Sequence, residues 1–472
     1  MKKYIGTKEF YKMVLLVAVP IMIQNGITNF VGMLDNIMVG QVGTNEMSGV
    51  AIINQMMLVF NISIFGAVSG AGIFGAQYYG CKDYEGVRYA FRYKLIACLL
   101  VVGGAIALFL TKGDALIGLY LSDTSDAADC AKTLVCAREY LLIMLLGLLP
   151  FALEQAYSAT LRETGETMLP MKAGVAAVLI NLIFNYLLIF GTFGFPKLGV
   201  NGAAIATVIS RYVQAAIVIY WSHKHLGRKP DNAQVQPYPF LHGVYRNFKI
   251  PAYLVGRITV KATPLMINEA MWALGVAGMM QCYSVRGLAV VAGMNISNTI
   301  TNVFSVVYMA MGNAIAIILG QLLGAGKTEE AKDTAGKLIF FSVASCVALA
   351  LVMMVFAPLF PEIYNTSDEV KKLSGYFIQV AAIAMPLCAF TNASYFTLRS
   401  GGKTVVTFFF DSVFMWTVAI PLAYILSRFT NLPIVPLYLI CQFTELIKCL
   451  IGYILVKKGI WIQNMTNREN AD

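Results

Sequence analysis

Two matching stretches, far apart in the chain, decide the fold. The first is NQMMLVFNISIFGAVSGAGIFGAQYYGCKDYE, residues 54–85, and the second is NTITNVFSVVYMAMGNAIAIILGQLLGAGKTE, residues 298–329. They align without a gap, and their identical pairs include Asn54 with Asn298, Phe60 with Phe304, Gln77 with Gln321 and Gly80 with Gly324. A repeat at a fixed offset is the signature of a duplicated structural unit. The chain is therefore predicted to consist of two copies of one unit.

Both copies are built from apolar segments that suit a lipid bilayer. Of the 472 residues, 58% are hydrophobic and only 13% are charged, which is about half of the roughly 25% charged fraction of soluble domains. Apolar runs of about 20 residues recur, each long enough to cross a hydrocarbon core of about 30 Å. We predict an all-α integral membrane protein with twelve transmembrane helices, at residues 10–38, 47–79, 95–110, 140–159, 168–190, 200–221, 254–277, 288–311, 338–356, 376–396, 405–426 and 434–456.

The repeat also predicts how the two halves are oriented in the membrane. Each half holds an even number of spans, so the copies share one orientation and their symmetry axis runs along the membrane normal. We predict an N-terminal six-helix lobe, residues 1–235, and a C-terminal six-helix lobe, residues 236–472, which face each other across a central cavity. The polar connection 222–249 is the expected linker between them.

The distribution of basic residues predicts the topology. Most of the 35 Lys and Arg fall in the alternate loops that also include both termini. By the positive-inside rule, both termini are cytoplasmic in a multi-pass protein of the inner or plasma membrane of the cell. The net charge of +10 is assigned to these loops, and no nucleic-acid partner is expected.

Residues that carry enzymatic or metal chemistry are scarce. The nine cysteines contain no Cys-x-x-Cys pair, and the three histidines, His223, His225 and His242, share one polar loop. Neither a zinc site nor acid–base catalysis inside the membrane is therefore expected. The acidic run 123–126 is interpreted as a solvated outer loop rather than a calcium site. No constellation typical of a membrane-bound transferase occurs, so no enzymatic activity is expected.

Polar side chains inside the N-terminal spans indicate a cation site. An ionised carboxylate in hydrocarbon costs at least about 2.5 to 3.5 kcal/mol, so Asp35 in the first span needs a partner or a function. Asn181 and Asn185, spaced i and i+4, share one face of the fifth span, and Thr207 lies in the sixth. Carboxylate, carbonyl and hydroxyl oxygens are what a dehydrated Na⁺ needs. The alternatives are a helix-end carboxylate at the outer surface and asparagines that only join helices.

The C-terminal half offers two acidic candidates. Glu269 is the only acid in the seventh span, and Asp411 lies in the eleventh. Each is a candidate for binding a proton or a cationic substrate. For Glu269, the alternative is a structural pair with Lys261 or Arg257 on the same helix.

Other residues in the spans are given structural or gating roles. Pro20 and Pro264 occupy equivalent places in the first span of each half, where the ring and the missing amide favour a kink. Such a kink can gate transport or can be a fixed bend. Two pairs of opposite charge are expected to neutralise each other, Glu445 with Lys448 and Glu154 with Arg211.

Taken together, these residues resemble the multidrug and toxic compound extrusion (MATE) transporters over essentially the whole chain. The resemblance rests on LDNIMVG at 34–40, GAQYYG at 75–80, LRETG at 161–165, NLIFNYLLIFG at 181–191, GVNGAAIAT at 199–207 and GQLLGAG at 320–326. It implies the MATE-type transporter fold. It also implies efflux of cationic, often aromatic compounds in exchange for Na⁺ or H⁺.

The resemblance assigns roles to individual residues. It implies a coupling-cation site, possible for Na⁺, at Asp35, Asn181, Asn185 and Thr207. Many relatives have aspartate where this chain has Asn185, which removes one negative charge. Glu269 resembles the acid that one bacterial branch has in its seventh span. The acid that some members place in the tenth span is missing, because residues 385–390 read MPLCAF.

We therefore expect a monomeric antiporter that works by alternating access, with a small, cationic substrate and no cofactor beyond the coupling ion. The alternative is a flippase for a lipid-linked saccharide of the same superfamily. Such a flippase needs basic residues in its cavity to meet phosphate. The basic residues inside or at the edge of the spans are Arg211, Arg257, Lys261 and Lys448.

Overall fold

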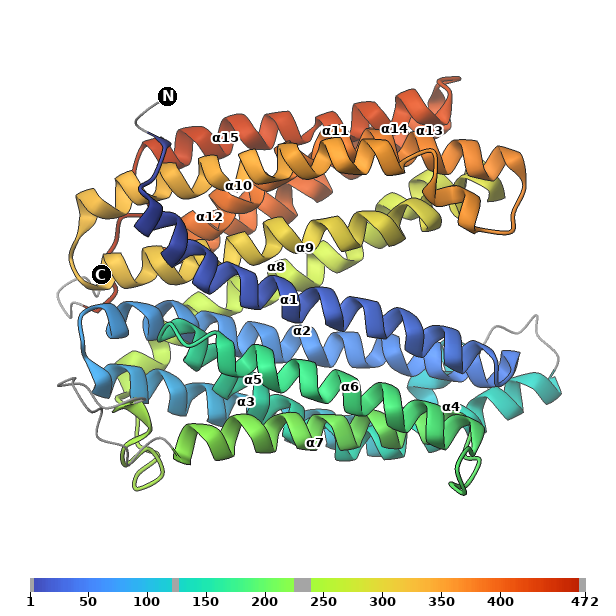
Figure 1. The fold of residues 1–472 in the computed structure, drawn as a ribbon, viewed down its shortest axis with the longest axis horizontal. Helices are drawn as coiled ribbons and strands as arrows, with labels where there is room; N and C mark the ends of the chain where they lie inside the picture. The colour runs from blue at the N-terminus through green and yellow to red at the C-terminus, as the bar shows by residue number, and fades with distance from the viewer. Residues whose placement is uncertain (1–3, 121–126, 225–238, 467–472) are drawn as a thin grey trace. The chain divides into compact units, whose positions relative to one another are not determined.

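The computed structural model describes residues 4–120, 127–224 and 239–466. In these ranges all regular elements are helical, as Figure 1 shows in chain order. They are α1 (Lys8–Gly40), α2 (Thr44–Gly80), α3 (Tyr84–Gly118), α4 (Ala127–Leu146), α5 (Leu148–Glu163), α6 (Met168–Phe190), α7 (Val200–Lys224), η3 (Pro239–Leu241), α8 (Ala252–Ser284), α9 (Leu288–Gly324), α10 (Thr328–Phe356), η4 (Phe360–Ile363), α11 (Asp368–Ser400), α12 (Thr404–Phe408), η5 (Phe409–Val413), η6 (Met415–Ala419), α13 (Ile420–Phe429), α14 (Ile434–Phe443) and α15 (Glu445–Lys457).

Each of the twelve predicted spans coincides with one helix or with consecutive helices. By length and composition, ten helical segments of the described chain are suited to cross a membrane, and eleven are if the bent pair α4–α5 counts as one. The predicted seventh span corresponds to α8, which is not among them because Pro264, Asn268 and Glu269 lower its mean hydropathy. The all-helical membrane fold predicted from the sequence is thus confirmed.

The predicted span 140–159 is a bent pair of helices rather than one straight helix. α4 and α5 meet at Gly147 at an angle of 45°. Pro150 lies in the first turn of α5, where a proline is tolerated because the amide it lacks has no partner within the helix. The break therefore follows from the Gly147 and Pro150 pair.

Contacts divide the chain into two units whose boundaries differ from those of the predicted lobes 1–235 and 236–472. Unit 1 comprises Met1–Met22, Ala76–Asp83 and Thr259–Asp472, and unit 2 comprises Ile23–Gly75 and Tyr84–Ile258. The start of α1 and the end of α2 therefore belong with the C-terminal helices. Residues 239–258 belong with the N-terminal helices.

Side-chain contacts explain why the start of α1 joins unit 1. The Tyr4 ring stacks on Phe340 of α10 with 6.2 Å between ring centroids, and Tyr11 lies 5.1 Å from Phe341. Two aromatic pairs on consecutive residues of α10 thus fix this segment.

The end of α2 joins unit 1 through Gln77 and two glycines. The Gln77 amide donates to the carbonyl of Ser400 at 2.9 Å, and its oxygen accepts from the amide of Met465 at 2.5 Å. A Cβ added at Gly80 would collide with the Gln321 carbonyl, and one added at Gly324 would collide with the Gln77 carbonyl. Because these positions are equivalent in the repeat, glycine at both lets α2 and α9 cross backbone to backbone.

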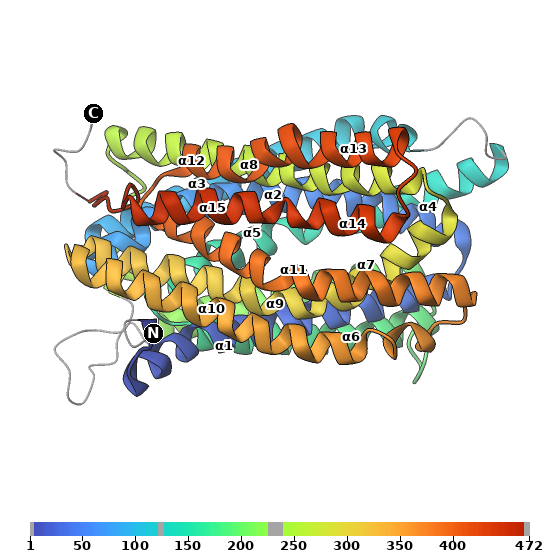
Figure 2. The same cartoon turned by 90° about the horizontal axis from the view of Figure 1, so that it is seen from above.

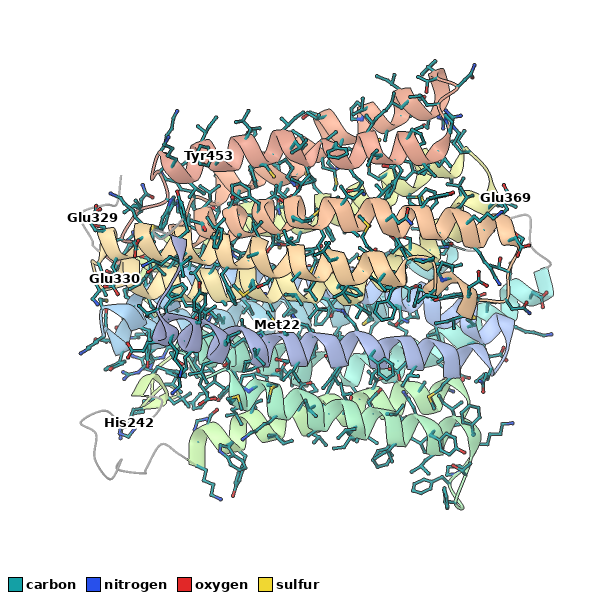
Figure 3. All side chains as sticks on the ribbon, turned by 45° about the horizontal axis from the view of Figure 1, so that its top comes forward. Met22, His242, Glu329, Glu330, Glu369 and Tyr453 are labelled. Atoms are coloured by element: carbon teal, nitrogen blue, oxygen red, sulfur yellow. The ribbon has the colours of Figure 1, made fainter. Side chains whose placement is uncertain are left out.

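In unit 1, α9 and α10 pack beside α11, and α14 and α15 lie along α11 (Figures 1 and 2). Phe377 of α11 is fully buried in an apolar core shared with α8, α9 and α14. Charged residues gather at the two ends of these helices. Glu329 and Glu330 begin α10 at one end, and Glu369 begins α11 at the other (Figure 3).

In unit 2, α7 packs against α4, α5 and α6, and α3 packs against α5. A buried ion pair joins the last two. Nζ of Lys94 on α3 lies 2.5 Å from Oε2 of Glu163 at the end of α5 and donates to Thr160 Oγ1 at 2.9 Å. Lys94 directly precedes the predicted span 95–110, and the sequence does not predict this pair.

Candidate functional site

The four residues predicted as a cation site form one hydrogen-bonded cluster in unit 2. Asn185 of α6 donates to Oδ1 of Asp35 on α1 at 2.6 Å, and its side-chain nitrogen lies 3.2 Å from the side-chain amide of Asn181. The side chains of Asn181 and Thr207 of α7 lie 3.3 Å apart. Three helices thus bring their polar groups to one point, as the i and i+4 spacing of the asparagines predicts.

The amide of Asn181 is best oriented with its nitrogen toward Asp35. In that orientation the nitrogen donates to both carboxylate oxygens, at 3.1 and 3.0 Å, and the amide oxygen accepts from Thr207 Oγ1 at 3.3 Å. Thr207 in turn has a second contact, to the carbonyl of Ala203 at 3.0 Å. The Asp35 carboxylate is therefore held by two amides, one from each asparagine.

Within the described residues, the charge of Asp35 is not balanced by any Lys or Arg in an ion pair. Asn181 and Asn185 are only 6% and 1% exposed, so little water screens this charge. Oδ1 of Asn185 is buried and has no hydrogen-bond partner among the described residues. A buried, unsatisfied oxygen beside an uncompensated carboxylate is a position that suits a small cation.

This donor set fits Na⁺. The Asp35 carboxylate, the free oxygen of Asn185, the oxygen of Asn181 and the hydroxyl of Thr207 are all hard oxygen ligands. The geometry differs from an ordinary helix-end carboxylate, because three helices contribute to it. The two asparagines can both join helices and bind a cation. When a side-chain amide rotates by half a turn, its oxygen takes the place of its nitrogen, so a hydrogen-bond donor is replaced by a cation ligand.

In the C-terminal half, Asp411 has a cationic partner of its own. Nζ of Lys448 on α15 lies 3.0 Å from Oδ1 of Asp411 and 3.4 Å from Oε1 of Glu445. The predicted pair of Glu445 and Lys448 is therefore formed, but the lysine is shared with Asp411. The Lys448 side chain is 10% exposed and Asp411 is 19% exposed, so this triad is largely removed from water.

Asn268 connects the triad to the rest of the site. Its amide donates to Oδ2 of Asp411 at 3.2 Å and to the Tyr395 hydroxyl at 3.4 Å, and its oxygen accepts from Ser412 at 2.7 Å. Asp411 and Ser412 lie in η5, a π-helical turn, a feature often found at functional sites. Sequence reasoning missed Asn268 and Ser412. Their one signal was that Asn268 directly precedes Glu269.

Glu269 is the carboxylate of this cluster that stays available. It is partly exposed, and among the described residues it forms no hydrogen bond or ion pair. The predicted structural pairs with Lys261 or Arg257 are therefore not formed. Its electrostatic neighbours are Arg399 of α11 and Asp411. Among the described residues, Glu269 thus lies near an acid that is paired with a lysine, and has no salt bridge of its own.

The predicted pair of Glu154 and Arg211 is wrong. Glu154 accepts hydrogen bonds from Ser158 at 2.5 Å and Gln155 at 2.9 Å. Arg211 contacts the carbonyl of Gly147 at 3.4 Å and lies over the Phe151 ring at 4.9 Å. The rotation of α7 relative to α5, which spacing along one helix does not fix, turns the two charges to different neighbours.

Three further predictions concern prolines, histidines and an acidic run. α1 and α8 each continue through their proline, Pro20 and Pro264, as unbroken helices, and the gating role stays a prediction. His223 contacts the Tyr157 hydroxyl at 3.0 Å. His225 and the acidic run 123–126 lie outside the described residues.

Comparisons with known proteins identify the family to which the chain is similar. The family model described as MatE matches residues 20–187 and 264–425. A probable multidrug resistance protein, NorM of Thermotoga maritima, is 24% identical over 90% of this chain and 87% of its own length. The multidrug resistance protein MdtK of Cronobacter sakazakii is 24% identical, over 88% of this chain and 87% of its own.

Solved structures show the same fold. A multidrug resistance MATE family transporter of the MOP superfamily, in an outward-facing conformation, has a TM-score of 0.82 at 18% identity and covers 97% of this chain and 98% of its own. The MATE transporter VcmN of Vibrio cholerae, in its bent form, has a TM-score of 0.81 at 17% identity, with coverage of 97% and 98%.

Proposed function

The chain belongs to the MatE family, and on that premise we propose that it is an antiporter that exports small cationic compounds in exchange for Na⁺ or H⁺. As a member of this family it is a multi-pass membrane transporter and not an enzyme. Its relatives are named multidrug resistance proteins, which supports the export of several different compounds as its function. Both termini are proposed to be cytoplasmic, and the transporter is proposed to act as a monomer by alternating access.

The observation that carries the coupling proposal is the Asp35 cluster. The Asp35 carboxylate accepts hydrogen bonds from two neutral amides, which do not balance its negative charge. The unsatisfied Oδ1 of Asn185 lies beside it. A bound Na⁺ takes the place of the amide donors when the asparagines turn their oxygens inward. A proton on Asp35 has a similar effect, because the acid then donates to an amide oxygen. Either ion neutralises the same charge.

The substrate side of the proposal rests on Glu269. This acid is partly exposed and unpaired among the described residues, whereas Asp411 is paired with Lys448. A cationic compound near Glu269 gains an ion pair in surroundings of low dielectric. A proton on Glu269 removes that attraction, so a proton and a cationic substrate compete for this carboxylate.

The flippase alternative is less well supported by the side chains. A phosphate-bearing lipid needs available cationic groups in the transport path. Lys448 is shared between Asp411 and Glu445, and Arg211 is engaged by a backbone carbonyl and an aromatic ring. Two of the four basic residues considered for this role are therefore already engaged.

Transport in proteoliposomes with separately imposed gradients tests the proposal. An inward Na⁺ gradient at constant pH, or an inward H⁺ gradient without Na⁺, should drive efflux of a fluorescent organic cation. One charge moving through 100 mV supplies about 2.3 kcal/mol, or roughly a 50-fold gradient. For one-for-one exchange with a monovalent cation this electrical contribution cancels, so the chemical gradient alone must suffice. Efflux that ignores both gradients would reject the antiporter.

A further inference from the structure

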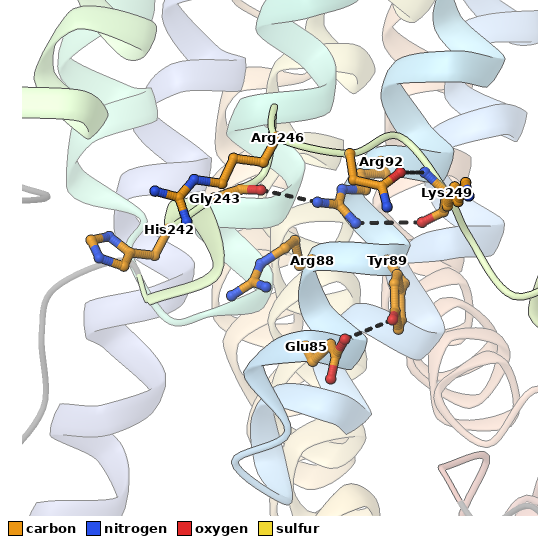
Figure 4. A pocket seen from close by; sticks show the side chains of 9 residues that line it. Glu85, Arg88, Tyr89, Arg92, His242, Gly243, Arg246 and Lys249 are labelled. Atoms are coloured by element: carbon orange, nitrogen blue, oxygen red, sulfur yellow. Dashed lines mark hydrogen bonds between the residues drawn. The ribbon is translucent and has the colours of Figure 1, made fainter.

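A basic cavity outside the cation and substrate sites lies in unit 2, between the start of α3 and the segment that follows η3 (Figure 4). Its volume is about 570 Å³. The charged and titratable residues that line it are Glu85, Arg88, Arg92, His242, Arg246 and Lys249. Four basic side chains thus face one carboxylate.

Arg92 builds the wall of this cavity. Its guanidinium donates to the carbonyls of Val244 at 2.9 Å, Gly243 at 3.0 Å and Lys249 at 3.4 Å. These three hydrogen bonds are all to backbone carbonyls, so Arg92 fixes residues 243–249 against α3 while its own positive charge is retained. Arg92 is therefore a structural residue of the cavity.

The other three basic residues are available to a ligand. In the described ranges, Arg88, Arg246 and Lys249 form no ion pair, and Nε of Arg88 is buried without a hydrogen-bond partner. Glu85 forms no ion pair with these three residues among the described residues, and its Oε1 accepts from the Tyr89 hydroxyl at 2.6 Å. Figure 4 shows Arg88 extending from α3, and Arg246 and His242 from the opposite segment.

An excess of basic residues on the cytoplasmic side is expected for any membrane protein, but it does not explain this cluster. At the start of α10 the basic residues are paired with acids three or four positions away, as Lys327 with Glu330 at 2.9 Å and Lys332 with Glu329 at 2.6 Å. The cavity instead concentrates unpaired positive charge. An unsatisfied, buried guanidinium nitrogen has a cost that a bound anion removes.

We propose that this cavity binds the phosphate group of an anionic ligand. Guanidinium groups match phosphate oxygens in pairs, and Arg88 and Arg246 supply two such groups. The depth suits a phospholipid headgroup, because Arg88 precedes the apolar run that begins at Leu95 by about 10 Å along the helix. The headgroup layer extends about 5 to 8 Å beyond the hydrocarbon edge, so the backbone of Arg88 lies just past its outer limit. A soluble phosphate compound offers the same chemistry. The proposal does not depend on the exported compound.

Binding measurements on the purified full-length protein test it. The probes are phosphatidylglycerol, with phosphatidylcholine as reference, titrated by native mass spectrometry, and inorganic pyrophosphate, titrated by calorimetry. The test variant is Arg88→Gln with Arg246→Gln. The matched control is Lys457→Gln with Lys458→Gln, which removes two exposed charges near the end of α15. The test variant loses a charged hydrogen bond from each of two guanidinium groups, worth at least about 1.5 kcal/mol each, so it should bind at least about 100-fold more weakly.

The control separates a built site from general attraction to basic surfaces. A loss of affinity in the test variant, with less than about a twofold loss in the control, supports binding in the cavity. A loss of affinity for phosphatidylglycerol alone identifies a lipid headgroup as the ligand, and a loss of affinity for pyrophosphate alone identifies a soluble phosphate compound. Equal losses in both variants, or none, would overturn the proposal.

Two single substitutions keep the test decisive if the double variant fails to fold. Arg88→Lys keeps the charge but not the paired hydrogen bonds, and should weaken binding several-fold. Glu85→Gln removes the one carboxylate among the described residues that line the cavity, yet keeps an acceptor for Tyr89, and should strengthen binding. Unchanged affinity in both variants would contradict the proposal.

Discussion

Replacing Asn185 by aspartate asks most sharply whether the Asp35 cluster is a cation site. The substitution changes one nitrogen to oxygen and preserves the shape of a side chain that is 1% exposed. That nitrogen donates to Asp35 at 2.6 Å. The change therefore places a second carboxylate oxygen where a hydrogen bond existed.

The electrostatic consequence is large. Two unit charges 2.6 Å apart repel by about 6 kcal/mol at an effective dielectric constant of about 20. The lost hydrogen bond to a charged group adds about 1.5 to 3 kcal/mol. A folded protein avoids this cost only by holding a proton or a cation between the two groups. Na⁺ should therefore bind Asn185→Asp more tightly than the wild type.

Thermal unfolding in detergent measures this binding directly. A ligand that binds only the folded state stabilises it by RT ln(1 + [L]/Kd), which is about 2.7 kcal/mol at one hundred times Kd. We expect the unfolding midpoint of Asn185→Asp to rise with NaCl and not with an equal concentration of N-methyl-D-glucamine chloride. The rise should exceed that of the wild type.

Asn201→Asp is the matched control. Asn201 also donates to a carboxylate, Oε2 of Glu139 at 2.8 Å, but in an exposed contact. Water screens the new charge there, so no Na⁺-specific shift is expected. The reasoning is refuted if Asn185→Asp gains no more from Na⁺ than the wild type or Asn201→Asp does.

Two further substitutions probe the C-terminal half. Glu269→Gln should weaken binding of cationic compounds about 10- to 100-fold, the value of a charged hydrogen bond, while neutral compounds of similar size lose little and the pH dependence of binding flattens. Equal losses for both compound classes with unchanged pH dependence would return Glu269 to a structural role. Lys448→Met leaves Asp411 and Glu445 without their cation and should cost about 3 to 5 kcal/mol of stability, measured by denaturant unfolding. Adding Asp411→Asn should recover part of that loss, and no recovery would mean that the 3.0 Å contact between Lys448 and Asp411 contributes little.

Much of the fold and of the N-terminal site follows from simple sequence patterns. The length of the apolar runs locates the spans, and the i and i+4 spacing of Asn181 and Asn185 places both on one face of α6. That Asp35 and Thr207 meet this face depends on how α1 and α7 pack. The sequence carries that information only through resemblance, and the structure confirms the meeting with contacts of 2.6 and 3.3 Å.

The C-terminal cluster could not be predicted in the same way. The partners of Asp411 come from α8 and α15, and the π-helical turn of η5 shifts the register of its side chains. No repeating sequence pattern predicts how separate helices are rotated relative to each other or where a π-helical turn occurs. For the same reason the expected pair of Glu154 and Arg211 is wrong.

The most direct test of the central claim, that cation binding at Asp35 is coupled to export, is to drive the exchange with the gradient of the organic cation and to measure the ion movement that it causes. Proteoliposomes receive only an outward gradient of an organic cation, without Na⁺ or pH gradients, and the movement of ²²Na⁺ or protons is recorded. The wild type should take up one of these ions as the organic cation leaves, and Asp35→Asn, with normal insertion and folding, should not. Ion uptake by Asp35→Asn that equals the wild type, with undiminished export, would contradict the account.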